Sequence, residues 1–148
     1  MEARSVRLLL AEDDENDAIF LARAFHKAGV LVPLERVADG VEAVKRLMDE
    51  DQPGVTHLLM DLKMPLKSGL EVLEWISRRA SSQIRVAVLT SSKVEEDVRR
   101  ASELGADFYL VKPAHTSDLV PICRQLGEWI GRDVRPKLSA DVLLPRPG

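Results

Sequence analysis

The stretch VRLLLAEDD at residues 6–14 decides the fold. Its first six residues are apolar except for Arg7, as in a strand that is covered on both faces. Three acidic residues, Glu12, Asp13 and Asp14, follow at once. An apolar run that ends in charged residues predicts a buried strand whose carboxyl end carries polar side chains.

Similar runs recur along the chain and alternate with helical patterns. Further strands are expected at residues 34–38, 57–60, 86–89 and 108–111. The first of these contains Glu35 and Arg36, which favours an edge position. Apolar residues at helical spacing predict five helices, at residues 18–25, 41–48, 70–76, 94–101 and 119–130. Strict alternation of strands and helices predicts a parallel sheet with helices on both faces.

Two serines carry the spacing of helix-start signals. Ser68 precedes Glu71 by three residues, and Ser92 precedes Glu95 by three residues. This is the spacing of the capping box, in which each side chain bonds the backbone of the other residue. We expect the third and fourth helices to begin there.

One domain accounts for most of the chain. We expect residues 1–131 to form it, because helical periodicity fades from Arg132 onward. Pro136, Pro145 and Pro147 then break what remains, so residues 132–148 are expected to be an extended or partly disordered tail.

The composition excludes several classes of protein. Charged residues make up 30% of the 148 residues and the net charge is -3, with no basic block that would follow a nucleic acid backbone. The single cysteine, Cys123, precludes an intramolecular disulfide and is expected to be buried and inert. No apolar run approaches the roughly 18 residues of a membrane span. We therefore expect a cytoplasmic protein that binds neither nucleic acid nor membrane.

Polar residues stand where the predicted strands end, which is where open parallel sheets bind ligands. Asp61 follows the third strand, Thr90 the fourth, and Lys112 the fifth. Together with Glu12 and Asp13, Asp61 would form a set of carboxylates that selects Mg²⁺ or a similar hard cation. A carboxylate is also a competent nucleophile toward phosphorus, while a lysine and a hydroxyl can hold phosphoryl oxygens.

Each of these residues also has an ordinary structural explanation. Asp13 and Asp14 can simply cap the first helix. A threonine often ends a strand, and Lys112–Pro113 is a common surface turn. The coincidence at four separate strand ends is what these separate explanations leave unexplained, so the pattern predicts one joint site.

Four segments resemble the receiver domains of two-component response regulators. They are LLLAEDD at 8–14, MDLKMP at 60–65 with Gly69, LTSS at 89–92 and GADFYLVKP at 105–113. The resemblance covers about residues 5–131 and implies a flavodoxin-like, doubly wound five-stranded parallel sheet of order 2-1-3-4-5. With Glu12 before Asp13 and little sequence after the domain, the chain is most similar to single-domain receivers that serve phytochrome-type or other sensor kinases.

The resemblance assigns a role to each site residue. Asp61 would accept the phosphoryl group, and Thr90 and Lys112 would contact it. Tyr109 would be the aromatic switch that turns inward when Thr90 moves; the alternative is a half-buried aromatic on an edge strand. The Lys112–Pro113 bond would be cis, as in the family.

The same resemblance implies a Mg²⁺ or Mn²⁺ site. Asp13 would bind the ion directly and Glu12 through water, with Asp61 and the backbone carbonyl of Lys63 as further ligands. Lys63 departs from the asparagine that is frequent in the family, and its ammonium would lie near the route of the attacking water.

The implied function is that of a phosphorelay response regulator. Its phosphoryl donor would be a sensor histidine kinase or a histidine phosphotransfer protein, and it would signal by protein–protein interaction. A homodimer through the fourth helix, fifth strand and fifth helix is one form of that interaction. It would catalyse only its own phosphorylation and dephosphorylation.

Two other functions compete with this one. The first is a docking module that works without phosphorylation. The second is an aspartate-nucleophile phosphatase, which we rank last because Lys63 stands where that chemistry needs a second aspartate. We expect His26, His57 and His115 at the surface, and we group Trp129 with the irregular tail.

Overall fold

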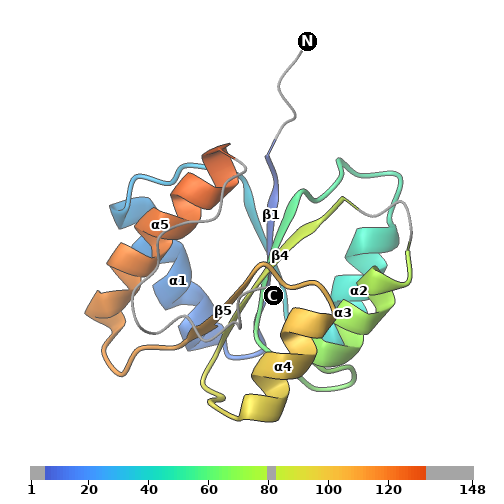
Figure 1. Ribbon diagram of the computed structural model, residues 1–148. Helices are drawn as coiled ribbons and strands as arrows, with labels where there is room; N and C mark the ends of the chain where they lie inside the picture. Colours follow the sequence, from blue (N-terminus) through green and yellow to red (C-terminus); the bar gives the residue numbers. More distant parts are fainter. Residues whose placement is uncertain (1–5, 80–82, 133–148) are drawn as a thin grey trace.

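The computed structural model describes residues 6–79 and 83–132, in which five strands alternate with five helices (Figure 1). The strands are β1 Leu8–Ala11, β2 Leu34–Val37, β3 His57–Met60, β4 Arg85–Thr90 and β5 Phe108–Val111. The helices are α1 Glu15–Lys27, α2 Gly40–Met48, α3 Gly69–Ser77, α4 Glu95–Glu103 and α5 Leu119–Arg132, with the short 3₁₀ helix η1 Thr116–Asp118 before α5. Every strand and helix expected from the sequence is present. Of the expected tail, residues 133–148 lie outside the described residues.

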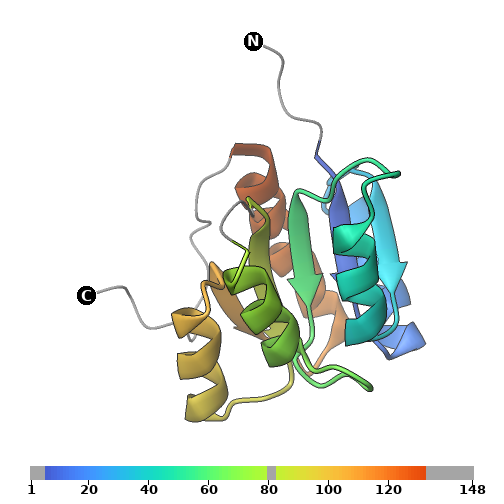
Figure 2. The ribbon, with the colours of Figure 1, turned by 90° about the vertical axis from the view of Figure 1, so that its right-hand side faces the viewer.

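All five strands run parallel in one sheet, in the order β2-β1-β3-β4-β5. Helices α1 and α5 cover one face, and α2, α3 and α4 cover the other, as Figure 1 and the view turned by 90° in Figure 2 show. The predicted doubly wound α/β fold is confirmed, and so is the edge position of β2. The carboxyl ends of all strands therefore lie at one edge of the sheet, and we call this edge the carboxyl edge.

Strand β1 forms the centre of the core because both of its faces are covered. Leu8 and Leu10 pack into the cluster formed with α1 and α5, whereas Leu9 and Ala11 pack into the cluster on the opposite face. None of the four is more than 2% exposed. Burial of each leucine stabilises the fold by roughly 1.5–3 kcal/mol, which holds the end of β1 firmly in place.

The two expected capping boxes have different outcomes. Ser68 and Glu71 form the complete box at the start of α3. Ser92 does not cap α4, which begins at Glu95 after Val94 and has no side-chain cap. The Ser92 hydroxyl instead donates to the Asp97 carboxylate at 2.6 Å. The same hydroxyl accepts from the Val94 N–H at 3.3 Å, so Ser92 orders the loop before α4, because the helix begins two residues later than the spacing predicts.

Two aromatic side chains differ from expectation. His57 is buried, not at the surface, and its ring packs edge-on against Trp129 with centroids 4.9 Å apart. Trp129 belongs to α5, is 1% exposed and also packs edge-on against Phe108. Both corrections have one cause, because α5 runs on to Arg132 and covers the start of β3. His26 and His115 are exposed as predicted.

Candidate functional site

Glu12 and Asp61 are brought together by the register of the sheet. Strands β1 and β3 pair so that Ala11 lies beside Met60, and each acidic residue follows its strand directly. The Asp61 N–H donates to the Ala11 carbonyl at 3.0 Å, which extends the ladder by one residue. Both acidic side chains are buried, with Glu12 1% and Asp61 7% exposed.

Asp13 completes a group of three carboxylates that we call the acid cluster: Glu12, Asp13 and Asp61. One carboxylate oxygen from each lies within 4.8 Å of the others, and Asp13 is the exposed member. Oxygen ligands at this spacing fit a hard divalent cation, which can bridge them and relieve their repulsion. The donor set therefore fits a divalent metal site, as the sequence predicted.

The neighbouring backbone fixes the outer oxygens of the acid cluster. The N–H of Lys63 donates to Asp61 Oδ1 at 3.2 Å, and the N–H of Asp14 donates to Glu12 Oε2 at 3.1 Å. Asp14 itself caps α1, because its carboxylate accepts from the N–H of Asp17. Coordination by the carbonyl of Lys63 stays a prediction.

Lys112 lies at the centre of the charged site although it follows β5 in sequence. Its Nζ donates to Glu12 Oε1 at 2.6 Å, to Asp61 Oδ2 at 2.8 Å and to Asp17 Oδ2 at 2.9 Å. Burial alone lowers the pKa of Lys112, but the three hydrogen-bonded carboxylates, Asp61 first, outweigh it and raise the pKa above its usual value. The ammonium therefore stays charged and offsets part of the negative charge.

The pKa of the Glu12 carboxyl is subject to opposing influences. Burial is the largest influence and raises its pKa, because a desolvated carboxylate is unfavourable. The hydrogen bond from Lys112 opposes this shift, while the charge of Asp61 adds to it, and the net shift is upward. A buried carboxylate with a raised pKa and a like-charged neighbour is typical of a functional site.

Thr90 and Tyr109 form a second group beside the acid cluster. Both are fully buried, and they meet through the loop after β4. The Thr90 hydroxyl accepts from the Ser92 N–H at 3.4 Å, and the Tyr109 hydroxyl donates to the Ser92 carbonyl at 2.9 Å. Burial raises the pKa of Tyr109. The ring thus points inward here, whereas the alternative of a half-buried edge aromatic is wrong.

The bond between Lys112 and Pro113 is trans, since the described residues contain no cis peptide bond. The expectation of a cis bond is wrong for this structure. The backbone N–H of Lys112 donates to the Thr90 carbonyl at 2.8 Å, which ties the lysine to the end of β4.

Two further residues at the site escaped the sequence reasoning. Asp17 reaches Lys112 from the first turn of α1, and Arg36 donates to the carbonyls of Glu12 and Asp13 at 3.0 and 3.3 Å. The signal for Asp17 was its position in the turn that follows the acidic residues. The signal for Arg36 was its place near the carboxyl end of a strand expected beside β1.

The fold and the site together define a class of signalling protein: a doubly wound parallel sheet whose carboxyl edge holds carboxylates for a divalent cation and a lysine for an anion. The sequence model of the response regulator receiver domain matches residues 8–124. The chain belongs to the response regulator receiver domain family, which serves signal transduction in two-component systems and is a signalling module rather than an enzyme of metabolism.

Three known proteins show how close the similarity is. The probable methanogenesis regulatory protein FilR2 of Methanothrix harundinacea is 34% identical over 87% of this chain and 86% of its own. The Mn²⁺-bound response regulator Rcp1 superposes with a TM-score of 0.79 and 29% identity, over 88% of this chain and 99% of that chain. The phosphorylated cyanobacterial phytochrome response regulator RcpA gives a TM-score of 0.79 and 27% identity, over 90% and 99%.

These similarities bear on the expected kind of receiver, a single-domain one that serves a phytochrome-type or other sensor kinase. The two solved neighbours are matched almost over their full length, and one is a phytochrome response regulator. This supports the predicted resemblance to single-domain receivers of that kind. Other curated relatives are longer, and the chain spans 53% of one and 61% of another. No helix within residues 6–79 and 83–132 is both long and apolar enough to cross a bilayer.

Proposed function

We propose that Asp61 accepts a phosphoryl group from a phosphohistidine and that the chain passes the signal on by contact with another protein. The observation that carries the proposal is that two further carboxylates and a lysine ammonium converge on Asp61. Its buried carboxylate shares a cation-sized space with Glu12 and Asp13 and lies 2.8 Å from the Lys112 ammonium. A stable fold has no need for so much like charge in one buried place.

The transfer step makes one bond and breaks another. A carboxylate oxygen of Asp61 attacks phosphorus, the bond from phosphorus to the histidine nitrogen breaks, and its electron pair stays on the imidazole. A divalent cation held by Glu12, Asp13, Asp61 and the Lys63 carbonyl, Mg²⁺ or Mn²⁺, would neutralise charge on the phosphoryl oxygens.

Lys112 and Thr90 hold the new acyl phosphate. The Lys112 ammonium already lies 2.8 Å from Asp61, so a phosphoryl oxygen on Asp61 would be within its reach after little movement. The Thr90 hydroxyl can donate to a second phosphoryl oxygen, which draws it away from the Ser92 N–H that it now accepts from. Since the Tyr109 hydroxyl bonds the same residue, that movement alters the loop before α4.

The output surface in this proposal is formed by α4, β5 and α5, which lie nearest to Tyr109. Pairing of two copies through it is one output. Val94 at the start of α4 is 54% exposed, whereas Arg99 is already paired with Glu96 and Glu103 of its own helix. Apolar contact at Val94 is therefore a better candidate for pairing than the charges. Sedimentation of wild type and Val94→Ser with and without beryllofluoride checks this, and equal oligomer size throughout contradicts it.

The test of acceptance is labelling with a small phosphodonor. Incubation with acetyl phosphate and Mg²⁺ should modify the wild type on a phosphate-affinity gel, and Asp61→Asn should stay unmodified. Asp14→Asn is the matched control, because it removes a carboxylate two residues from Glu12 while asparagine still caps α1. Equal labelling of wild type and Asp61→Asn would show that the acceptor is another residue. A wild type that takes no label from either acetyl phosphate or a phosphorylated kinase would favour the docking module instead.

A further inference from the structure

Lys112 has no spare hydrogen-bond donor. An ammonium offers three N–H groups, and the three carboxylates of Glu12, Asp17 and Asp61 use all of them, at 2.6, 2.9 and 2.8 Å. A phosphoryl oxygen that reaches Lys112 must therefore replace one of these acceptors. Which one it replaces determines how tightly the site holds the phosphoryl group.

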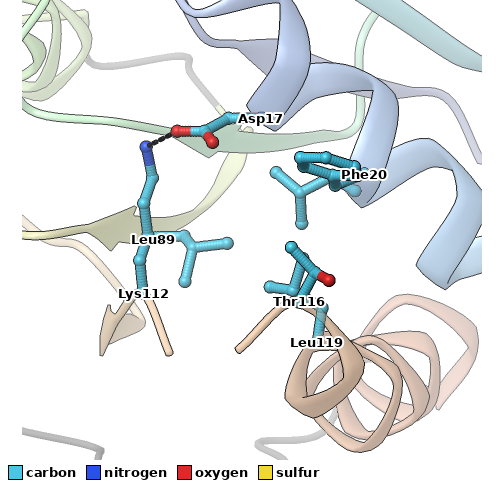
Figure 3. Close-up of a pocket in the computed structure, with 7 residues that line it drawn as sticks. Asp17, Phe20, Leu89, Lys112, Thr116 and Leu119 are labelled. Atoms are coloured by element: carbon cyan, nitrogen blue, oxygen red, sulfur yellow. Dashed lines mark hydrogen bonds and ion pairs between the residues drawn. The ribbon is translucent and has the colours of Figure 1, made fainter. Parts of the chain in front are cut away.

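The three hydrogen bonds hold the ammonium in this position, and the stem of Lys112 borders a small pocket. This pocket of about 50 Å³ lies between α1 and the start of α5 (Figure 3). The other residues that line the pocket are Asp17, Phe20, Leu21, Leu89, Thr116 and Leu119. The methylene groups of Lys112 face this pocket, while the charged end bonds Asp17, as the dashed line in Figure 3 shows. The ammonium can exchange partners but cannot move far.

Asp17 differs from the other two acceptors in position and exposure. Glu12 and Asp61 belong to the acid cluster, so a divalent cation draws on their oxygens, whereas Asp17 lies outside it. The Asp17 side chain is 41% exposed, against 2% and 8% for Glu12 and Asp61. Water can therefore solvate Asp17 when it gives up the lysine. Asp17 is the acceptor that a phosphoryl oxygen displaces at the smallest loss.

We propose that Asp17 competes with the phosphoryl group for Lys112 and so weakens the hold of the site on that group; the proposal rests on the function proposed above. Asp17 is a positioning residue, because it acts on the phosphoryl group through Lys112. Removal of its charge weakens this hydrogen bond, and removal of the whole carboxylate frees one N–H, so in either case the lysine becomes more attractive to an anion. A partly exposed ion pair contributes a small free energy, so we expect tighter anion binding by about 2- to 5-fold.

The test measures beryllofluoride, an analogue of the phosphoryl group, by fluorine NMR at saturating Mg²⁺. Asp17→Asn, which keeps the shape of the side chain, and Asp17→Ala should both bind it more tightly than wild type does. Asp17→Glu restores the carboxylate and should return the affinity toward the wild-type value. Glu15→Gln is the matched control, since Glu15 is an exposed carboxylate in the same turn of α1 and the same charge is removed. It should leave the affinity within about 1.5-fold of wild type.

Two results would overturn the proposal alone. One is wild-type affinity, or weaker, in both Asp17→Asn and Asp17→Ala while the wild type binds beryllofluoride normally. The other is an equal gain in Glu15→Gln, which would mean that net charge acts at long range and Lys112 plays no part. A wild type that fails to bind beryllofluoride would overturn the proposed function as well, so the two failures are distinguishable.

Discussion

The two edges of the sheet bury polar groups in opposite ways. At the amino edge, where the strands begin, Thr56 and His57 contact each other at 2.8 Å and the backbone of Arg7 bonds the Thr56 hydroxyl. Trp129 covers this group, with its ring perpendicular to that of His57. The Thr56 hydroxyl is satisfied by its neighbours and the aromatic rings pack against each other, so the amino edge is held by neutral contacts that add to stability.

The carboxyl edge concentrates charge instead. The carboxylates of Glu12, Asp17 and Asp61 contact the ammonium of Lys112, and Asp13 adds a fourth carboxylate beside Glu12 and Asp61. Repulsion among them is relieved only in part by Lys112 and by Arg36, which bonds the backbone of Glu12 and Asp13, because four carboxylates outnumber these two cations. The difference teaches that the carboxyl edge keeps unbalanced charge at some loss of stability, as the proposed binding of a cation and a phosphoryl group requires, whereas the amino edge buries neutral groups.

The largest expected effect on stability comes from a substitution that disrupts the packing at the amino edge. Trp129→Ala removes a side chain that is 1% exposed and leaves a cavity beside His57 and Phe108. We expect a loss of about 3–5 kcal/mol in the free energy of unfolding, measured by urea denaturation. The loss should be the same with and without Mg²⁺. Trp75→Ala, at a partly exposed position on α3, is the control and should lose less. A loss that Mg²⁺ reverses would contradict the division between the two edges.

The second effect on stability comes from a substitution that removes the lysine at the carboxyl edge. Lys112→Ala leaves the buried carboxylates of Glu12 and Asp61 without their cation. In the presence of a chelator we expect a loss of about 3 kcal/mol in the free energy of unfolding. Mg²⁺ should recover part of it, because a divalent cation takes over the role of the ammonium. Calorimetric melting with EDTA or Mg²⁺ measures both values, and an identical loss in the two conditions would contradict the idea that the edge is electrostatically strained.

How much of this contrast the sequence could predict depends on the range of the interactions. The apolar runs at 6–11 and 57–60 define β1 and β3, and these fix the place of Glu12 and Asp61 through the register alone. The carboxyl edge was therefore predictable, since every residue at the end of a strand meets its neighbours there.

Contacts made by helices across the sheet were harder to predict. His57 lies in an apolar run, but only the length of α5 places Trp129 over it. Asp17 contacts Lys112 from 95 residues away, and its helical position alone does not say that a lysine lies opposite. Ser92 has the spacing of a capping residue, yet its hydroxyl bonds Val94 and Asp97 and α4 begins two residues later, at Glu95. In each case the deciding partner comes from packing or from local competition that spacing does not describe.

A third effect, the stabilisation of the fold by Mg²⁺, tests which carboxylates at the carboxyl edge bind the ion. Mg²⁺ at 100 times its dissociation constant should stabilise the wild type by about 2.7 kcal/mol. Asp13→Asn should lose most of this gain, since Asp13 is the exposed member of the acid cluster. Asp14→Asn should keep it, because the Asp14 carboxylate caps α1. Thermal melting over a Mg²⁺ series measures both, and a larger loss in Asp14→Asn would mean that the wrong acid has been assigned to the metal.

The smallest effect concerns Cys123, a buried thiol away from both edges, in the core between α5 and the sheet. Burial raises its pKa to about 12, because a thiolate cannot be solvated there. The folded state therefore binds this proton more tightly than the unfolded state, whose thiol has a pKa of about 8.5–9. The stability that results is complete below the unfolded pKa and is lost as the pH rises toward 12. At pH 10 we expect a loss of about 1.5 kcal/mol relative to pH 8.

Cys123→Ala isolates that loss from other groups that titrate in the same range, including Tyr109, whose pKa is also raised. The pH dependence of unfolding by urea should be flatter in the variant between pH 8 and pH 10 by the same amount. A thiol reagent such as dithionitrobenzoate should also react with the native wild type at pH 8 only as fast as the protein unfolds. Rapid reaction of the folded protein, or parallel pH profiles for wild type and variant, would mean that water reaches the thiol and that α5 does not seal this face of the sheet.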